Sequence, residues 1–160
     1  MFKKLAIAVL ALFMGLTVYN ESSAQSYATS AGLRLGVSNG LTVKHFIKEN
    51  TALEGIIHTR YRGVILTGLF EIHKDINEVK GLRWFYGGGG HVGFWGSSIG
   101  RYNDRYGNTT IIGIDGIIGL DYLFEDFPLN VSLDYKPAFN LTGRTGFWGT
   151  ESALSLRYAF

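Results

Sequence analysis

The sequence predicts an all-β protein, an eight-stranded antiparallel up-and-down transmembrane β-barrel that is preceded by a cleavable signal peptide. Three observations support this prediction. Residues 151–160 alternate strictly, with Leu154, Leu156 and Tyr158 on one face and small or polar residues on the other, which is the period of a β-strand. Seven further strand-like segments lie between turn signals. A short basic and apolar segment precedes them all.

The first residues have the order of a secretory signal. Two lysines give a basic start, residues 5–18 form an apolar stretch, and small residues follow at 22–24. The apolar stretch is shorter than the about 20 residues that a membrane-spanning helix needs. We therefore predict a signal peptide over residues 1–24 and a barrel domain over residues 25–160. The absence of cysteine argues against a lipoprotein anchor and a disulfide framework.

Composition narrows the class of partner. The formal net charge of +2 leaves no basic excess to neutralise phosphates, so nucleic acid is not an expected partner. Glycine is frequent, with 22 residues, which suits turns and tightly curved sheet. Only 2 prolines are present, which suits continuous strands.

Extended segments follow one another along the barrel domain without helical periodicity. Each alternates between apolar and polar or small residues, and most have the about 9–11 residues that a tilted membrane strand needs. The second segment is the shortest. In chain order they cover residues 27–37, 41–47, 52–61, 64–74, 81–95, 109–124, 128–141 and 151–160.

Turn chemistry supports this division. Residues 38–40 fit a three-residue hairpin loop with Gly40 in the left-handed region, and residues 62–63 fit a two-residue loop. Residues 124–128 form a short polar turn between aromatic ends. The hairpins at 38–40 and 62–63 keep side chains of the same face opposite each other. The register that these turns set therefore agrees with the alternation of apolar and polar residues.

Loop length predicts an orientation. The two longest connections, 96–108 and 142–150, follow the fifth and seventh segments and therefore lie at one end of the barrel. The turns after the second, fourth and sixth segments are short. Long external loops and short periplasmic turns are typical of outer-membrane barrels. We expect an extracellular partner, if there is one, at these two loops.

The chain thus resembles the small eight-stranded outer-membrane barrels of Gram-negative bacteria, the OmpA- and OmpX-like group. The resemblance covers residues 25–160 and rests on the signal segment, the strand count, the loop order and the terminal Phe160. It implies a location in the cell outer membrane, contact with outer-membrane lipid and insertion by the barrel-assembly machinery. It also implies that Tyr158 and Phe160 of the last strand act as the insertion signal.

Alternation assigns each side chain to the lipid or to the lumen. The side chains assigned to the lipid include no Asp, Glu, Lys or Arg. This is expected, because a charge facing the bilayer midplane costs about 2–4 kcal/mol. Eight strands enclose a space that side chains fill. We therefore predict a packed lumenal ion network, rather than a wide channel, made by Arg34, Lys44, Glu54, Arg60, Glu71, Arg83, Asp115, Asp121, Asp134, Lys136 and Arg157.

The expected register predicts specific contacts within this network. It places Glu54 opposite Glu71, and two neighbouring carboxylates need a cation or a shared proton. Arg83, which flanks the same turn as Glu71, is the candidate cation. Arg157 is expected to meet Asp134. The sequence leaves open whether the network is static or responds to pH.

His45 conflicts with the pattern. It points outward in the register that points Lys44 inward. A bulge or an early strand end would explain it, and the sequence does not decide between them.

Aromatic residues gather at both ends of the predicted barrel, which favours two interfacial belts. The outer belt includes Trp95, Phe147 and Trp148, and the periplasmic belt includes Phe124 and Phe127. The fifth to seventh segments are longer than a bilayer demands. We therefore predict that one wall rises as a lopsided sheet, whose edge offers a site for a partner strand.

Patterns that suggest chemistry are weak. The glycine run 87–90 lacks the lysine and the helix of a phosphate loop, so we interpret it as strongly bent or closely packed strand. Glu71 and His73 share a face, but zinc takes three or four ligands, so we expect no metal and no cofactor. No serine has a histidine at local spacing on the last two segments, which argues against an enzyme.

The sequence favours an integral outer-membrane protein with a structural, surface-interaction or limited small-solute passage role. Two alternatives remain open. A secreted or periplasmic lipocalin-like barrel would bind a small apolar ligand inside and expose Arg34, Arg83, Asp134 and Arg157 to solvent. An outer-membrane acyl-chain enzyme would need a nucleophile, a base and an orienting acid within hydrogen-bond reach.

Overall fold

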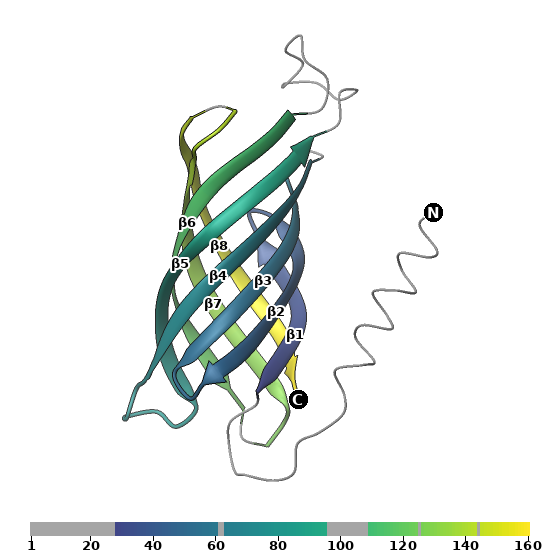
Figure 1. Cartoon of the computed structure of the whole chain (residues 1–160). Coiled ribbons are helices and arrows are strands. Elements are labelled where there is room, and N and C mark those ends of the chain that lie inside the picture. The colour runs from purple at the N-terminus through teal and green to yellow at the C-terminus, as the bar shows by residue number, and fades with distance from the viewer. Residues whose placement is uncertain (1–27, 61–62, 96–108, 125, 144) are drawn as a thin grey trace, which may run out of the picture.

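A computed structural model describes residues 28–60, 63–95, 109–124, 126–143 and 145–160. These residues form eight antiparallel strands that close into a barrel in chain order (Figure 1). The predicted fold class, an all-β barrel of eight antiparallel strands, is confirmed. The strands are β1 (Thr29–Gly36), β2 (Asn39–Lys48), β3 (Thr51–Arg60), β4 (Gly63–Asp75), β5 (Leu82–Trp95), β6 (Thr109–Leu123), β7 (Leu129–Asn140) and β8 (Gly146–Ala159).

The barrel closes where β1 pairs with β8 as well as with β2. Thr29 and Phe160 exchange backbone hydrogen bonds, with the Thr29 N–H donating at 3.1 Å and the Phe160 N–H at 2.8 Å. A closed sheet pairs the backbone groups that an open edge would leave free. The described residues contain no helix that is long and apolar enough to cross a membrane.

The wall of the barrel is uneven in height. β1, β2 and β3 have 8, 10 and 10 residues, whereas β5, β6 and β8 have 14, 15 and 14. The long strands rise at the end of the barrel opposite the C-terminus (Figure 1). The lopsided sheet is found as predicted for β5 and β6, but β7 has only 12 residues and β8 is the third long strand.

Burial alternates along the strands and separates two kinds of surface. Outward side chains such as Leu33, Ile57 and Leu133 are between 52% and 56% exposed, whereas Arg34 and Lys44 are fully buried in the lumen. Two small apolar clusters also face inward, namely Ile56, Leu69, Phe85 and Ile117, and Ile65 with Ile111. This polarity is the reverse of what a lipocalin-like barrel requires.

The predicted first hairpin is wrong in detail. Gly40 lies within β2, opposite Arg34 on β1 and His58 on β3, so the chain turns at residues 37–38. The side chain of Asn39 accepts a hydrogen bond from the Gly36 N–H at 3.2 Å, which supports the tighter turn. No left-handed glycine is needed at position 40, because the turn lies before it.

The predicted start of β8 and the extent of the 142–150 loop are also wrong. β8 begins at Gly146, which leaves a short connection over 141–145. Gly146 and Gly149 have φ angles of 141° and 119°, and the pairing with β7 shifts between Ala138 and Phe139. These irregularities hide the strand in the sequence, because a bulge interrupts simple alternation.

The register between β3 and β4 differs from the predicted one by two residues. Arg60 pairs with Gly63, so Gly63 begins β4 instead of completing a loop. Glu54 consequently lies opposite Leu69, and Glu71 lies opposite Ala52. A shift of two keeps every side chain on its face but changes every partner.

Candidate functional site: the lumenal ion networks

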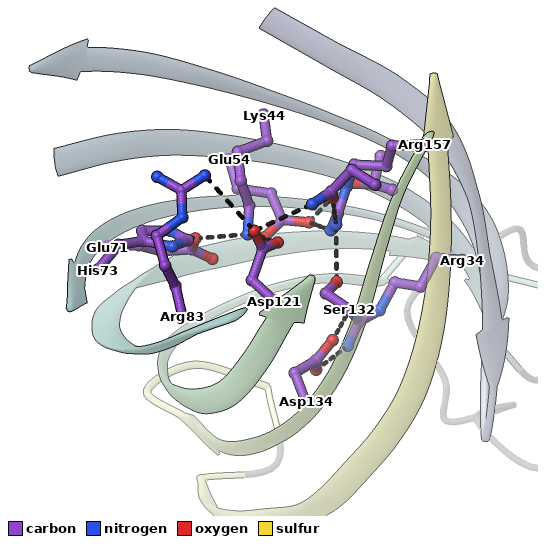
Figure 2. A network of polar contacts seen from close by, with 12 residues as sticks. Arg34, Lys44, Glu54, Glu71, His73, Arg83, Asp121, Ser132, Asp134 and Arg157 are labelled. Atoms are coloured by element: carbon purple, nitrogen blue, oxygen red, sulfur yellow. Dashed lines mark hydrogen bonds and ion pairs between the residues drawn. The ribbon is translucent and has the colours of Figure 1, made fainter. Parts of the chain in front are cut away.

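Two networks of charged and polar side chains lie in the lumen. The lower network lies towards the end that holds Phe160, and Figure 2 shows most of it. Its charged and imidazole members are Lys44, Glu54, Glu71, His73, Arg83, Asp121 and Arg157. The upper network consists of His58, Arg60, His91, Asp115, Lys136, Asn140 and Glu151.

Lys44 is the common cation of the lower network. Its Nζ lies 2.8 Å from Glu71 Oε2, 3.5 Å from Glu54 Oε2 and 3.8 Å from Asp121 Oδ1. The ammonium also lies 4.2 Å from the centre of the Phe85 ring, in the range of a cation–π contact. One lysine on β2 therefore joins carboxylates from β3, β4 and β6.

Arg157 of β8 provides the second centre of the lower network. Its guanidinium binds Glu54, donates from Nη1 to Ser132 Oγ at 2.7 Å and to Asn130 Oδ1 at 3.2 Å, and donates from Nε to Thr42 Oγ1 at 3.2 Å. The planar fork of an arginine suits several fixed acceptors at once. Because Glu54 contacts both Lys44 and Arg157, the two centres form a single network (Figure 2).

Aromatic rings flank the lower network. His73 Nε2 lies 3.1 Å from Glu71 Oε2, and its ring stacks on Phe85 with centroids 5.0 Å apart. The Arg83 guanidinium lies 4.8 Å from the centre of the Phe46 ring and 3.9 Å from Asp121 Oδ2.

Arg34 and Asp134 form a separate bidentate pair. The guanidinium nitrogens of Arg34 on β1 lie 2.5 and 2.6 Å from the two carboxylate oxygens of Asp134 on β7. β8 lies between these two strands, so the pair connects strands that are not neighbours.

The upper network is centred on Lys136. Its Nζ lies 2.9 Å from Asp115 Oδ1 and 3.4 Å from Glu151 Oε2, and Arg60 adds a contact to Glu151 at 3.0 Å. The His91 ring lies between Asp115, at 2.7 Å from Nδ1, and Asn140, at 3.0 Å from Nε2.

Each network is electrically balanced among the described residues. With neutral histidines, the lower network contains three cations and three acids, the Arg34–Asp134 pair contains one of each, and the upper network contains two cations and two acids. Buried charges are stable only when paired in good geometry. The lumen is thus filled by matched polar groups.

Glu151 is the acid that the sequence prediction missed. It is 2% exposed and bridges Lys136 and Arg60. A signal was present, because alternation from Ala153, Ser155 and Arg157 places position 151 inward. The predicted strand 151–160 begins at this residue, so Glu151 has no preceding strand position from which its direction follows.

Glu54 and Glu71 are neighbours that share a cation, as predicted, but the predicted registers, the predicted cation and the Arg157–Asp134 contact are wrong. Glu71 lies opposite Gly87, and Arg83 lies between Asp75 on β4 and Asp121 on β6. Arg157 lies opposite Asn130 on β7 instead of Asp134. Lys44 takes the role that was assigned to Arg83.

His45 faces outward on an uninterrupted part of β2, and its Nδ1 lies 2.8 Å from Thr29 Oγ1. The register shift of this strand occurs further along, between Phe46 and Lys48. Neither a bulge at His45 nor an early strand end is needed to explain its direction.

Predicted features at the barrel ends are only partly described. Phe124, Phe127 and Phe147 are exposed, as are Tyr158 and Phe160, whose ring centres are 6.3 Å apart. The signal segment 1–24, the loop 96–108 and the side chains of Trp95 and Trp148 lie outside the described residues.

Chemical groups for catalysis or metal binding do not converge in the described part of the chain. No cluster of three or more His, Cys, Asp or Glu side chains there is arranged to hold a metal ion. The Ser132 hydroxyl accepts from Arg157, which does not provide the base that a nucleophile needs.

Comparison with known proteins supports the fold. No protein-family model and no curated protein matches the sequence. Among solved structures, the chain is similar to the N-terminal β-barrel domain of Pseudomonas aeruginosa OprF, with a TM-score of 0.63 and 16% identity over 85% of this chain and 100% of that chain. It is also similar to Neisserial surface protein A, with a TM-score of 0.50 and 11% identity over 82% of this chain and 94% of that one. The chain therefore has the fold of the small OmpA- and OmpX-like barrels.

Proposed function

We propose that the protein is an integral outer-membrane β-barrel with a structural and surface-interaction role. The observation that carries this proposal is the inverted polarity of the barrel. Its outward strand faces are apolar and exposed, while its charges are buried and paired inside. In water this arrangement would expose a large apolar belt, whereas in a bilayer it satisfies both faces.

The orientation follows from the length of the single connection 96–108 and from wall height. The end with Phe160 faces the periplasm, and the higher wall of β5, β6 and β8 faces outside. The signal peptide over residues 1–24 and insertion through Tyr158 and Phe160 belong to the same proposal. The proposed surface for interaction is the outer rim of the wall formed by β5, β6 and β8.

Passage of small solutes is the second candidate and is less well supported. Lys44 and Arg157 reach across the lumen to acids on other strands, which leaves the interior occupied. An enzymatic role lacks a supporting geometry in the described lumen.

Membrane fractionation combined with a heat-modifiability gel tests the proposal. We expect the protein in the outer-membrane fraction, as a folded band that shifts in mobility only after boiling. A protein recovered entirely in the soluble periplasmic or secreted fraction would refute it.

A further inference from the structure

An apolar groove crosses the outward surface of β1, β2, β3 and β4. It has a volume of about 480 Å³. Leu33, Leu41 and Ile57 form one wall and are 52–53% exposed, while Val43 and Gly55 lie along the floor. The volume lies within the range of small-ligand sites, about 300–1,000 Å³.

The groove arises from the strand register. Leu33, Leu41 and Ile57 lie opposite one another on successive strands and make a row of large side chains. The next outward row contains Val43 and Gly55, and continues to Gly68 on β4. A Cβ atom added at either glycine would meet nothing within 4 Å.

A second row of large side chains limits the groove on its periplasmic side. Leu53 and Phe70 lie opposite each other in this row, and each is 47% exposed. The small residues therefore form a channel between two raised rows, open towards the lipid.

The end of this row at β1 and β2 is polar. Thr29 and His45 are two residues from Ala31 and Val43 on the same outward face, and His45 Nδ1 lies 2.8 Å from Thr29 Oγ1. Both groups lie at the end of the barrel that the proposed orientation assigns to the periplasm. Because these two groups are hydrogen-bonded to each other, the pair keeps one donor for a phosphate oxygen, either the imidazole Nε2–H or the Thr29 hydroxyl.

We propose that the groove holds one acyl chain of a phospholipid from the periplasmic leaflet, with the lipid phosphate at His45 and Thr29. This inference rests on the proposed membrane location. Within a bilayer, close van der Waals contact, rather than the hydrophobic effect, retains the chain in the groove. The polar pair binds the phosphate of the lipid headgroup, which the apolar lining of the groove cannot do.

A second copy of the barrel fits the groove less well. A stable interface needs about 800 Å² from each partner. The raised leucine and isoleucine row would hold a second barrel away from the floor of the groove. A flexible acyl chain has no such difficulty.

Native mass spectrometry of the full protein, extracted from outer membranes in mild detergent, tests the acyl-chain site. Gly55→Leu fills the floor where the added atoms meet open space. Gly116→Leu is the matched control, because it adds the same side chain at an outward position of β6, where the Cβ meets Pro137 at an ordinary 3.4 Å. Heat modifiability verifies that each variant is folded, and Ala31→Leu replaces Gly55→Leu if the latter does not fold.

We expect one retained phospholipid on the wild-type protein and on Gly116→Leu, and at least a severalfold lower lipid-bound fraction on Gly55→Leu. Equal retention by all three proteins would overturn the proposal. A dimer that only Gly55→Leu disrupts would also overturn it in favour of a second copy. Absence of the wild-type protein from the membrane fraction would instead refute the proposed function.

The headgroup contact has its own test. Delipidated protein is mixed with phosphatidylglycerol or with diacylglycerol of the same acyl chains. We expect wild-type protein to prefer phosphatidylglycerol and His45→Ala to lose up to about tenfold of that preference, the effect of one lost hydrogen bond. Thr59→Ala, an exposed outward position of β3 outside the polar pair, is the control. An unchanged preference in His45→Ala would refute the assignment of the phosphate.

Discussion

Lys44 is the residue on which the lower network depends most. Its ammonium is fully buried and is shared by Glu54, Glu71 and Asp121. Removing one partner from a buried ionic network leaves uncompensated charge, whereas removing an exposed lysine changes little.

We predict that Lys44→Met lowers the free energy of unfolding by about 3–5 kcal/mol, because three carboxylates lose their shared cation. Urea unfolding in lipid vesicles, followed by the heat-modifiable band, measures the change. Lys48→Met is the control, since it makes the same substitution at an exposed position of the same strand. Equal unfolding midpoints for the two variants would contradict the role given to Lys44.

Two inward glycines make room for aromatic rings on the neighbouring strand. Gly113 lies opposite His91, and Gly119 lies opposite Phe85. A Cβ added at Gly119 would lie 2.6 Å from Phe85 Cζ and 2.5 Å from the Leu133 carbonyl oxygen. Neither contact is tolerable without movement of the ring or the backbone.

Gly119→Ala should therefore destabilise the barrel by about 1–3 kcal/mol through overpacking. Gly68→Ala, where the added Cβ meets nothing within 4 Å, should not. Near-ultraviolet circular dichroism and unfolding in urea report the displaced ring and the lost stability. A Gly119→Ala protein as stable as Gly68→Ala would show that the lumen is more loosely packed than the structure indicates.

At the scale of the strand, alternation predicts which face a residue occupies far better than it predicts the partner of that residue. The inward positions of Arg34, Lys44 and Glu54 follow from period two alone. Register depends instead on one or two turn residues, and the shift at Gly63 places Glu54 diagonal to Glu71 rather than directly opposite it.

Contacts across the lumen are beyond any argument from neighbouring strands. Arg157 on β8 reaches Glu54 on β3, and Arg34 on β1 reaches Asp134 on β7. These partners are fixed by the curvature of the closed barrel and by side-chain length. The sequence carries that information only after the whole register is known.

The outward face of β7 offers a test of the membrane role of one strand. Leu133 is 56% exposed and lies well inside the strand, whereas Leu129 is its first residue. We predict that Leu133→Arg costs about 2–4 kcal/mol and that Leu129→Arg costs about 0–1 kcal/mol, because the penalty falls towards the interface. Unfolding midpoints in vesicles measure both. Equal penalties would place Leu133 outside the apolar core of the bilayer.

At the scale of the whole molecule, the lumen combines neutrality with close packing. Each of the two networks, and the Arg34–Asp134 pair, contains as many cations as acids. An ion entering the barrel would have to displace these contacts, because the interior of an eight-stranded barrel is filled by side chains.

Planar bilayer recordings should accordingly show no stable conductance for the folded wild-type protein at neutral pH. The control recording uses the same amount of detergent added to the bilayer without protein. A stable open channel in most insertion events would favour the solute-passage role over a structural one.

Whether the barrel spans the membrane is tested by the environment of the outward face of β7 in a reconstituted bilayer. The chain has no cysteine, so Leu129→Cys, Val131→Cys, Leu133→Cys and Tyr135→Cys each give one site for a nitroxide label. Collisions of the label with oxygen and with a water-soluble nickel complex are then compared by electron paramagnetic resonance. We expect oxygen to dominate at all four positions, most strongly at Leu133. Dominance of the nickel complex at these positions would show that the apolar face meets water and would contradict a membrane-spanning barrel.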